Sequence, residues 1–202
     1  MLKWFLILAA AYLLGSIPFG YLLVRIFHGE DVRRSGSGNI GATNVSRKSP
    51  TLGALTLFLD AAKGFSAVEL AAHFSRAAAD PRLMAAAALF AIIGHMFPLW
   101  LRFRGGKGVA TALGAFVRLA PLAVGCAVII FVVVVLISRR ISLGSIVTAA
   151  FFPATVWSLK VSTDPAVLAL IGVASLLIIG RHYKNILRLM SGEEPRFSLR
   201  HK

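Results

Sequence analysis

The sequence predicts an all-α polytopic membrane protein with about seven transmembrane helices, one of them short. Hydrophobic residues make up 57% of its 202 residues, and the mean hydropathy is +0.79, whereas about half of the residues are apolar in an ordinary soluble domain. Uninterrupted apolar stretches recur at lengths close to the roughly 20 residues that span a bilayer. Most basic residues lie between these stretches, which is the usual arrangement in a membrane protein.

The apolar stretches predict spans at about 4–26, 52–74, 83–101, 108–119, 121–138, 143–160 and 165–182. The first is expected to be retained rather than cleaved as a signal peptide, because equally apolar segments follow it. The fourth is too short to cross alone at about 1.5 Å per residue. Residues 108–138 therefore form either one long broken helix or a short helix and a full one that meet at Pro121.

Charge distribution favours seven spans. The chain has a formal net charge of +14, and with seven spans most Lys and Arg residues, including Arg200 and Lys202 of the tail, share one side. The opposite side keeps few, among them Arg76. By the positive-inside rule, the N-terminus is expected outside and the C-terminus in the cytoplasm. The positive charge then needs no nucleic-acid partner, and residues 1–202 are expected to form a single membrane-embedded domain.

Three polar segments fall on the predicted cytoplasmic side. The first, residues 33–48 (RRSGSGNIGATNVSRK), combines glycines, asparagines and flanking arginines before a helix. Such a loop can turn backbone N–H groups toward phosphate oxygens, and Arg47 offers a planar bidentate partner for the same anion. The alternative is a flexible polar loop.

The second segment, residues 94–111 (GHMFPLWLRFRGGKGVAT), places Gly105, Gly106 and Gly108 around Lys107 just before a helix. This pattern indicates another anion cradle with a point charge, although it lacks the spacing of a nucleotide-binding P-loop. The third segment, residues 181–194 (RHYKNILRLMSGEE), puts His182 and Asn185 on one helix face because they are three residues apart.

Asp60 and Lys63 lie three apart within the second predicted span, so we expect them to form a structural ion pair. The G-x-G-x-x-G pattern at residues 36–41 resembles a dinucleotide fingerprint, but no strand precedes it and Asp60 lies in an apolar helical run. The chain also lacks an H-x4-D motif and a G-x-S-x-G elbow. Its lone Cys126 lies in an apolar run without an activating cation.

Taken together, these segments resemble the bacterial acyl-phosphate:glycerol-3-phosphate acyltransferases, the PlsY family. The resemblance runs from GSIPFG through SGNIGATN, FLDAAKG, GHMFP with RGGKGVAT, and RHYKNILRL, and covers essentially the whole chain. It implies transfer of an acyl group from acyl phosphate to the sn-1 hydroxyl of glycerol 3-phosphate, giving lysophosphatidic acid and phosphate. It also implies a multi-pass protein of the bacterial inner membrane with its active site at the cytoplasmic face.

The resemblance implies roles for particular residues of this sequence. It assigns glycerol 3-phosphate binding to Ser37, Arg47, Lys107, His182 and Asn185, the last two being catalytic. It assigns the acyl-phosphate head to Gly38, Asn39, Thr43, Gly105, Gly106 and Ser142. No cofactor or metal is implied, and the expected partners are the two substrates, membrane lipids and, as a possibility, the soluble enzyme that makes acyl phosphate. A transporter or flippase of an organic phosphate remains the alternative, since helix breaks and anion-binding loops also suit that class.

Overall fold

The computed structural model describes residues 1–75 and 80–197, and throughout that part of the chain every regular element is a helix. Three charges used in the predicted distribution, Arg76, Arg200 and Lys202, lie outside the described residues. The chain divides into two compact units, residues 1–119 and 120–202. The all-α class is thus confirmed for the described residues, whereas the single functional domain stays a prediction.

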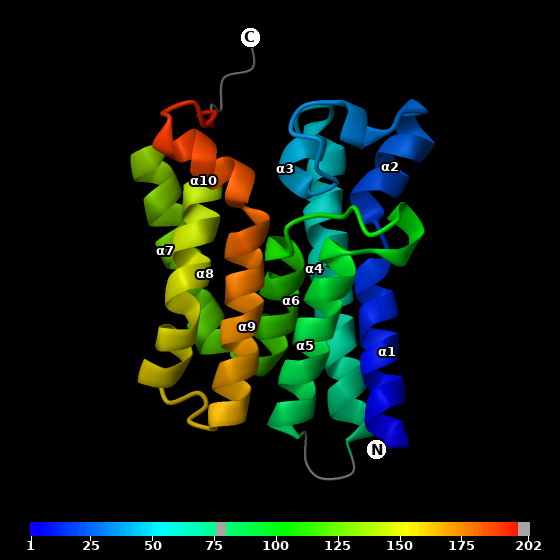
Figure 1. Cartoon of the computed structure of the whole chain (residues 1–202), viewed down its shortest axis with the longest axis vertical. Coiled ribbons are helices and arrows are strands. Elements are labelled where there is room, and N and C mark those ends of the chain that lie inside the picture. The colour runs from blue at the N-terminus through cyan, green and yellow to red at the C-terminus, as the bar shows by residue number, and fades with distance from the viewer. Residues whose placement is uncertain (76–79, 198–202) are drawn as a thin grey trace. The chain divides into compact units, whose positions relative to one another are not determined.

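The first unit is built around a four-helix packing arrangement of α1, α4, α5 and α6 (Figure 1). Its elements are α1 (Leu2–Ser16), α2 (Phe19–His28), the 3-10 helix η1 (Val32–Arg34), α3 (Ala42–Val45), α4 (Pro50–Phe74), α5 (Pro81–Met96), the 3-10 helix η2 (Leu99–Leu101) and α6 (Val109–Leu119). α5 lies deepest, since 72% of its most apolar window is buried.

Glycines let the helices of the first unit approach backbone to backbone. A Cβ on Gly15 of α1 would lie 2.1 Å from the Ala91 carbonyl oxygen of α5, and one on Gly94 would lie 2.2 Å from the Tyr12 oxygen. The α4–α6 contact repeats this arrangement, because a Cβ on Gly114 would lie 1.8 Å from the Ala61 carbonyl oxygen. Small residues at helix contacts are the usual way to gain packing inside a bilayer, where lipid is as apolar as leucine.

The first predicted span is broken near its middle. Ile17 has φ −62° and ψ 115°, so the chain leaves the helical conformation before Pro18, and α2 restarts at Phe19. Proline supplies no N–H to a preceding turn, which explains why the break falls there. Residues 2–28 still form one candidate span of 27 residues.

The second unit comprises α7 (Pro121–Ser138), α8 (Ile141–Ser158), α9 (Pro165–Arg181) and α10 (Tyr183–Met190). α7 begins at Pro121 after Ala120, whose φ of −146° and ψ of 61° are not helical. Residues 108–138 therefore form a short helix and a full one, which was one of the two alternatives. Only 11% of the α7 window is buried within the protein, so we expect this helix to face lipid.

Among the described residues, five helical segments are long and apolar enough to cross a membrane. α9 qualifies only together with α10, from which it is bent by 57°, and α6 is a shorter apolar helix. The multi-pass class is confirmed by this pattern, while the count of seven and the orientation of the termini stay predictions.

Within each unit, the connections that carry the predicted site residues gather at one end. In the first unit, Figure 1 shows α2 and α3 at the end of the helices opposite the N-terminus. η2 joins them there, because its Leu101 belongs to a buried cluster with Val24, Val32, Ile40, Val45 and Leu52. In the second unit, the α7–α8 connection meets the chain that follows α10, where the Phe197 amide donates to the Arg139 carbonyl at 2.6 Å.

Candidate functional site

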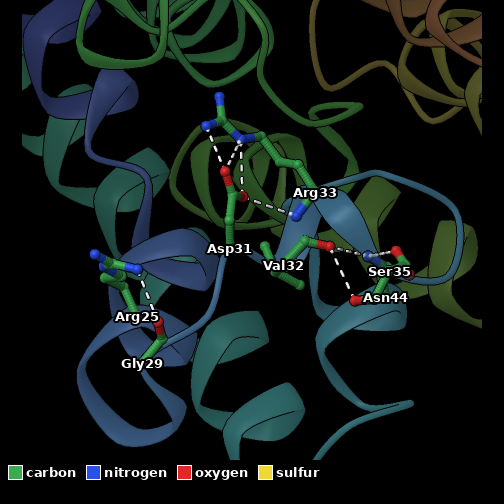
Figure 2. A network of polar contacts seen from close by, with 7 residues as sticks. All are labelled: Arg25, Gly29, Asp31, Val32, Arg33, Ser35 and Asn44. Atoms are coloured by element: carbon green, nitrogen blue, oxygen red, sulfur yellow. Dashed lines mark hydrogen bonds and ion pairs between the residues drawn. The ribbon is translucent and has the colours of Figure 1, made fainter.

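The loop that joins α2 to α4 is organised by Asn44, a residue that no sequence pattern singles out. Asn44 is only 3% exposed. Its Nδ2 shares its two N–H groups among the carbonyl oxygens of Val32 (3.1 Å), Ser35 (3.0 Å) and Asn39 (2.8 Å). Figure 2 shows the amide reaching the oxygens of Val32 and Ser35. Its Oδ1 accepts from the Ser37 amide at 2.8 Å, so one side chain binds four points of the loop.

This network explains two of the glycines. Gly36 has φ +59°, and a Cβ there would lie 2.2 Å from Asn44 Oδ1, so only glycine fits. Gly38 has φ +69° and donates its amide to the Ser35 carbonyl at 3.1 Å. The Asn39 side chain accepts from the Gly41 amide at 2.8 Å. The loop amides of Ser37, Gly38 and Gly41 therefore stabilise the loop itself.

Side chains, rather than those three amides, form the outer surface of this loop. Ser37, Thr43 and Arg47 are all exposed. Nη1 of Arg47 lies 3.2 Å from the position of a Cβ on Gly36, which places its guanidinium beside the Gly36–Ser37 turn. Two hydroxyls and a guanidinium together suit a phosphate, because they combine hydrogen-bond donors with a fixed positive charge.

A salt bridge holds the start of the same loop. Arg33 binds the Asp31 carboxylate through Nε and Nη2, the shortest distance being 2.7 Å (Figure 2). Its guanidinium lies 5.1 Å from the Tyr21 ring centroid. The Arg33 hydrogen bond keeps the pKa of Asp31 below its usual value, although partial burial opposes the shift. Arg33 is thus a structural residue of the loop.

The second glycine segment folds back onto the end of α5. The Gly105 amide donates to the Met96 carbonyl at 3.1 Å, and the Gly106 amide donates to the His95 carbonyl at 3.0 Å. Both glycines are buried, and Lys107, which follows them, is half-buried. The two amides expected to hold an anion thus contribute to the fold, and Lys107 is the charged group of this segment.

Arg102 and Phe103 turn the chain between η2 and these glycines, with φ of 52° and 62°. Left-handed conformations are unusual for residues with a Cβ. Both side chains are exposed, and so is Trp100. Exposed aromatic and arginine side chains beside an apolar span suit the lipid headgroup region.

The predicted ion pair between Asp60 and Lys63 is present, with Lys63 Nζ 2.7 Å from Asp60 Oδ1. Both residues are buried, at 1% and 4% exposure. His95 is a third member of this cluster, because its Nδ1 lies 3.5 Å from the same carboxylate oxygen. The sequence alone offered no indication of this contact.

In the second unit, His182 occupies the bend between α9 and α10. Its amide donates to the Ile179 carbonyl at 2.9 Å, three residues back, while its Nδ1 lies 2.7 Å from the Ile178 carbonyl oxygen. The side chain thus takes the acceptor that the amide would use in a continuous α-helix. Because a carbonyl only accepts, Nδ1 carries the proton and Nε2 is the basic nitrogen of the neutral ring.

Asn185 is buried like His182, and its backbone amide donates to the His182 carbonyl at 2.8 Å. Its Nδ2 donates to Glu194 Oε1 at 2.6 Å. Ser142, in the first turn of α8, donates to the same oxygen at 2.6 Å. Two residues expected to serve different substrates therefore meet at one carboxylate.

Glu194 is the centre of this cluster. Arg188 Nε donates to its other oxygen at 2.8 Å, so Arg188 binds a carboxylate rather than facing solvent alone. Burial raises the pKa of Glu194, but hydrogen bonds from Ser142, Asn185 and Arg188 outweigh it and hold that pKa below the usual value. The pairing of Glu194 with Arg188 joins neighbours in the sequence. Its hydrogen bond with Ser142 spans 52 residues and could not be predicted from the sequence.

Across residues 1–75 and 80–197, no group of three or more His, Cys, Asp or Glu side chains is arranged to hold a metal ion. The predicted site residues thus fall into two sets. Ser37, Gly38, Asn39, Thr43 and Arg47 share one loop of the first unit, whose η2 neighbour leads to Gly105, Gly106 and Lys107. Ser142, His182 and Asn185 belong to the second unit.

Comparison with known proteins connects both sets to one family. A family model described as glycerol-3-phosphate acyltransferase matches residues 5–192. A glycerol-3-phosphate acyltransferase of Syntrophotalea carbinolica is 47% identical over 98% of this chain and 99% of its own length. One of Ehrlichia chaffeensis is 44% identical over 96% of both chains.

Two crystal structures of PlsY (YgiH), an integral membrane glycerol 3-phosphate acyltransferase, are also similar to this chain. The glycerol 3-phosphate form has a TM-score of 0.89, 36% sequence identity and 96% coverage of both chains. The lysophosphatidic acid form has a TM-score of 0.87 and 35% identity, with 96% of this chain and 95% of that chain covered.

Proposed function

The chain belongs to the glycerol-3-phosphate acyltransferase family, and we propose that its donor is acyl phosphate and its acceptor the sn-1 hydroxyl of glycerol 3-phosphate. The products would be lysophosphatidic acid and inorganic phosphate, in phospholipid biosynthesis. The observation that carries this proposal is the family match over residues 5–192, which includes the first two polar segments and residues 181–192 of the third. Solved relatives are described with the proposed acceptor and the proposed product.

Acyl phosphate suits the residues that the chain provides. It is an activated mixed anhydride, so the acceptor oxygen can attack the carbonyl carbon directly while the carbon–oxygen bond to phosphate breaks. Phosphate leaves with the electron pair, and the hydroxyl proton passes to a base. The sequence carries no H-x4-D motif and no G-x-S-x-G elbow, and Cys126 lies within the apolar helix α7. A direct transfer requires none of these groups.

For the acceptor, we propose that Ser37, Arg47 and Lys107 bind the phosphate of glycerol 3-phosphate, while His182 and Asn185 orient its hydroxyl. The exposed Ser37 and Arg47 support this assignment, because both lie at one turn and offer complementary donors. His182 supports it because Nε2 is its basic nitrogen. The base is either this nitrogen or the phosphate of the donor.

For the donor, we propose contacts from Gly38, Asn39, Thr43, Gly105, Gly106 and Ser142. The amides of Gly38, Gly105 and Gly106 donate to backbone carbonyls, so we expect these glycines to act through loop shape and close approach. Thr43 and Ser142 contribute hydroxyls. The acyl tail would remain in the bilayer, where burial of each methylene contributes about 0.8 kcal/mol.

We further propose seven membrane crossings in a bacterial inner membrane, an outer N-terminus, a cytoplasmic C-terminus and an active site at the cytoplasmic face. The gathering of basic loops at one end within each unit supports this orientation. A single functional domain would then draw glycerol 3-phosphate from the cytoplasm and the donor from the bilayer. The soluble enzyme that makes acyl phosphate is the protein partner that this supply suggests.

The donor assignment is tested with the purified protein, glycerol 3-phosphate and either acyl phosphate or acyl-CoA. Lysophosphatidic acid and phosphate should form in equal amounts from acyl phosphate without ATP, acyl-CoA or added metal. Formation of lysophosphatidic acid with acyl-CoA but not with acyl phosphate would contradict the proposal.

Absence of a covalent acyl-enzyme is tested separately by incubating the protein with acyl phosphate and labelled phosphate, without acceptor. Direct attack predicts no label in acyl phosphate. An acyl-enzyme formed reversibly would exchange the label into it, and that result would exclude direct attack.

A transporter of an organic phosphate is the second candidate, and the helix breaks at Pro18 and Ala120 favour it. Reconstituted vesicles separate the two functions. Uptake of labelled glycerol 3-phosphate without acylation would indicate transport, whereas acylation without net uptake would indicate the enzyme.

A further inference from the structure

The buried cluster of Asp60, Lys63 and His95 is larger than an ion pair needs to be. All three side chains are at most 4% exposed, on the adjacent helices α4 and α5. Charged groups within a membrane-spanning segment are expensive and are usually retained for a function or a pairing role. The reaction proposed above uses none of the three, so their arrangement needs its own explanation.

On one side, the cluster meets the break in the first span. Lys63 Nζ donates to the Ile17 carbonyl at 2.7 Å, the oxygen that precedes Pro18. The same ammonium lies 5.7 Å from the Phe19 ring centroid. Lys63 therefore compensates both the Asp60 charge and a carbonyl that the helix break removes from ordinary helical bonding.

On the other side, His95 meets the glycine segment. Its carbonyl accepts the Gly106 amide at 3.0 Å. A Cβ on Gly106 would lie 2.0 Å from His95 Nε2, and one on Gly105 would lie 2.1 Å from the His95 carbonyl oxygen. The ring and the backbone of His95 together form the surface on which the residues before Lys107 rest.

Asp60 fixes the orientation of that surface. Its carboxylate lies 3.5 Å from His95 Nδ1, so Nδ1 faces the acid and Nε2 faces Gly106. We propose that His95, held by the Asp60–Lys63 pair, is a positioning residue that sets the place of the Gly105–Lys107 segment and thereby the affinity for the phosphorylated acceptor. This inference rests on the proposed role of Lys107 in acceptor binding.

The test compares His95→Asn with His95→Gln in the purified full-length protein. Asparagine keeps an amide near the Nδ1 position but leaves space beside Gly106, whereas glutamine extends toward the Nε2 position. We expect His95→Asn to raise KM for glycerol 3-phosphate about tenfold or more with kcat changed far less, because small misplacements of binding groups have large effects. His95→Gln should restore much of the affinity.

The matched control is His73→Asn, the same substitution at an exposed histidine of α4, which should leave KM unchanged. If the role of His95 were purely structural, His95→Asn would lower the midpoint of thermal unfolding and leave KM for the acceptor unchanged. An unchanged KM in folded His95→Asn would therefore overturn the proposal.

A coupled pair keeps the inference testable if His95→Asn alone folds poorly. Gly106→Ala should raise KM for the acceptor, because its Cβ meets Nε2. The effect should shrink in the His95→Asn background, where that atom is gone. If His95→Asn does not fold, an unchanged KM in Gly106→Ala overturns the inference. If both variants fold, the inference is overturned when the two substitutions raise KM independently, so that their effects multiply in the double variant.

Wild-type activity, measured in the same series, separates this inference from the proposed function. Wild-type protein that forms no lysophosphatidic acid would count against the proposed function. In that case the affinity for labelled glycerol 3-phosphate, measured directly on wild type and His95→Asn, still tests the positioning role.

Discussion

The polar end of the first unit and that of the second are each organised by one buried side chain, but the two differ in chemistry. Asn44 in the first is a neutral amide that donates to three carbonyls and accepts from one amide. Glu194 in the second is a carboxylate that accepts from a hydroxyl, an amide and a guanidinium.

This difference in chemistry predicts which of the two hydrogen-bond networks responds to pH. An amide does not titrate, so the loop around Asn44 keeps its hydrogen bonds across the physiological range. A carboxylate that serves only as an acceptor loses part of that role when it is protonated. The Asn44 network is thus a pH-independent support of its loop, and the Glu194 cluster is a pH-dependent one.

Asn44→Ala is expected to have the largest effect. It removes the acceptor of the Ser37 amide and a donor to three carbonyls, of which those of Val32 and Ser35 keep donors from Ser35 and Gly38. Each polar group left unmet costs about 1–3 kcal/mol. Acyl transfer should fall about 100-fold or more, and the thermal midpoint should drop. Ser46→Ala is the matched control in the same loop, since its hydroxyl makes one exposed bond to the Thr43 carbonyl.

Asn44→Asp sharpens the same comparison, because it keeps the Oδ1 acceptor for the Ser37 amide and loses the three donated bonds. It should be nearly as damaging as alanine. Activity of Asn44→Asp near that of wild type would show that the loop does not depend on the amide.

Glu194→Gln should have an intermediate effect. Glutamine keeps an acceptor for Ser142 and Asn185 but loses the charge that Arg188 binds. Hydrogen bonds to charged groups contribute about 1.5–3 kcal/mol, so we expect a loss of roughly 10-fold in transfer, with Glu194→Ala worse. The measurement is kcat of each variant, and the midpoint of thermal unfolding shows that the variant is folded.

The pH dependence of stability separates the two ends further. The pKa of Glu194 is lowered in the folded protein, so its contribution is present above the ordinary glutamate pKa of 4.5 and is lost as pH falls through the lower folded value. Thermal midpoints should therefore fall more steeply in acid for wild type than for Glu194→Gln. Parallel curves for the two proteins would contradict this account.

Asp31→Asn is expected to have the smallest effect. Its ion pair with Arg33 is partly exposed, at 20% and 31% of the two side chains, and such pairs contribute about 1 kcal/mol or less. Transfer should change less than about threefold. A loss as large as that of Asn44→Ala would move the organising role from the amide to the salt bridge.

Much of the helical layout could be predicted from hydropathy and from the prolines at helix starts. Pro50, Pro81, Pro121 and Pro165 each begin a helix, as proline suits the first helical position. The Asp60–Lys63 pair followed from local spacing, and the boundary at Pro121 was one of two alternatives that the sequence left open. These features depend on neighbours in sequence, which is why a single chain reveals them.

The organising residues could not be predicted because each gains its role from several contacts that only the folded chain brings together. Asn44 looks like any loop asparagine until four partners converge on it, and Glu194 meets Ser142 across 52 residues. His95 ends an apolar helix and gains its role only from the contact with Asp60 and Gly106. A role of the glycine loops in phosphate binding stays a prediction, and several of their amides support the fold instead of facing outward.

The central claim is that the polar ends of both units serve one acyl transfer. It is tested most directly by lysophosphatidic acid formation from acyl phosphate and glycerol 3-phosphate with wild type, Arg47→Ala of the first unit and Asn185→Ala of the second. Wild type should form product, and each folded variant should lose about 100-fold or more of the activity. Wild-type turnover in either folded variant would contradict it.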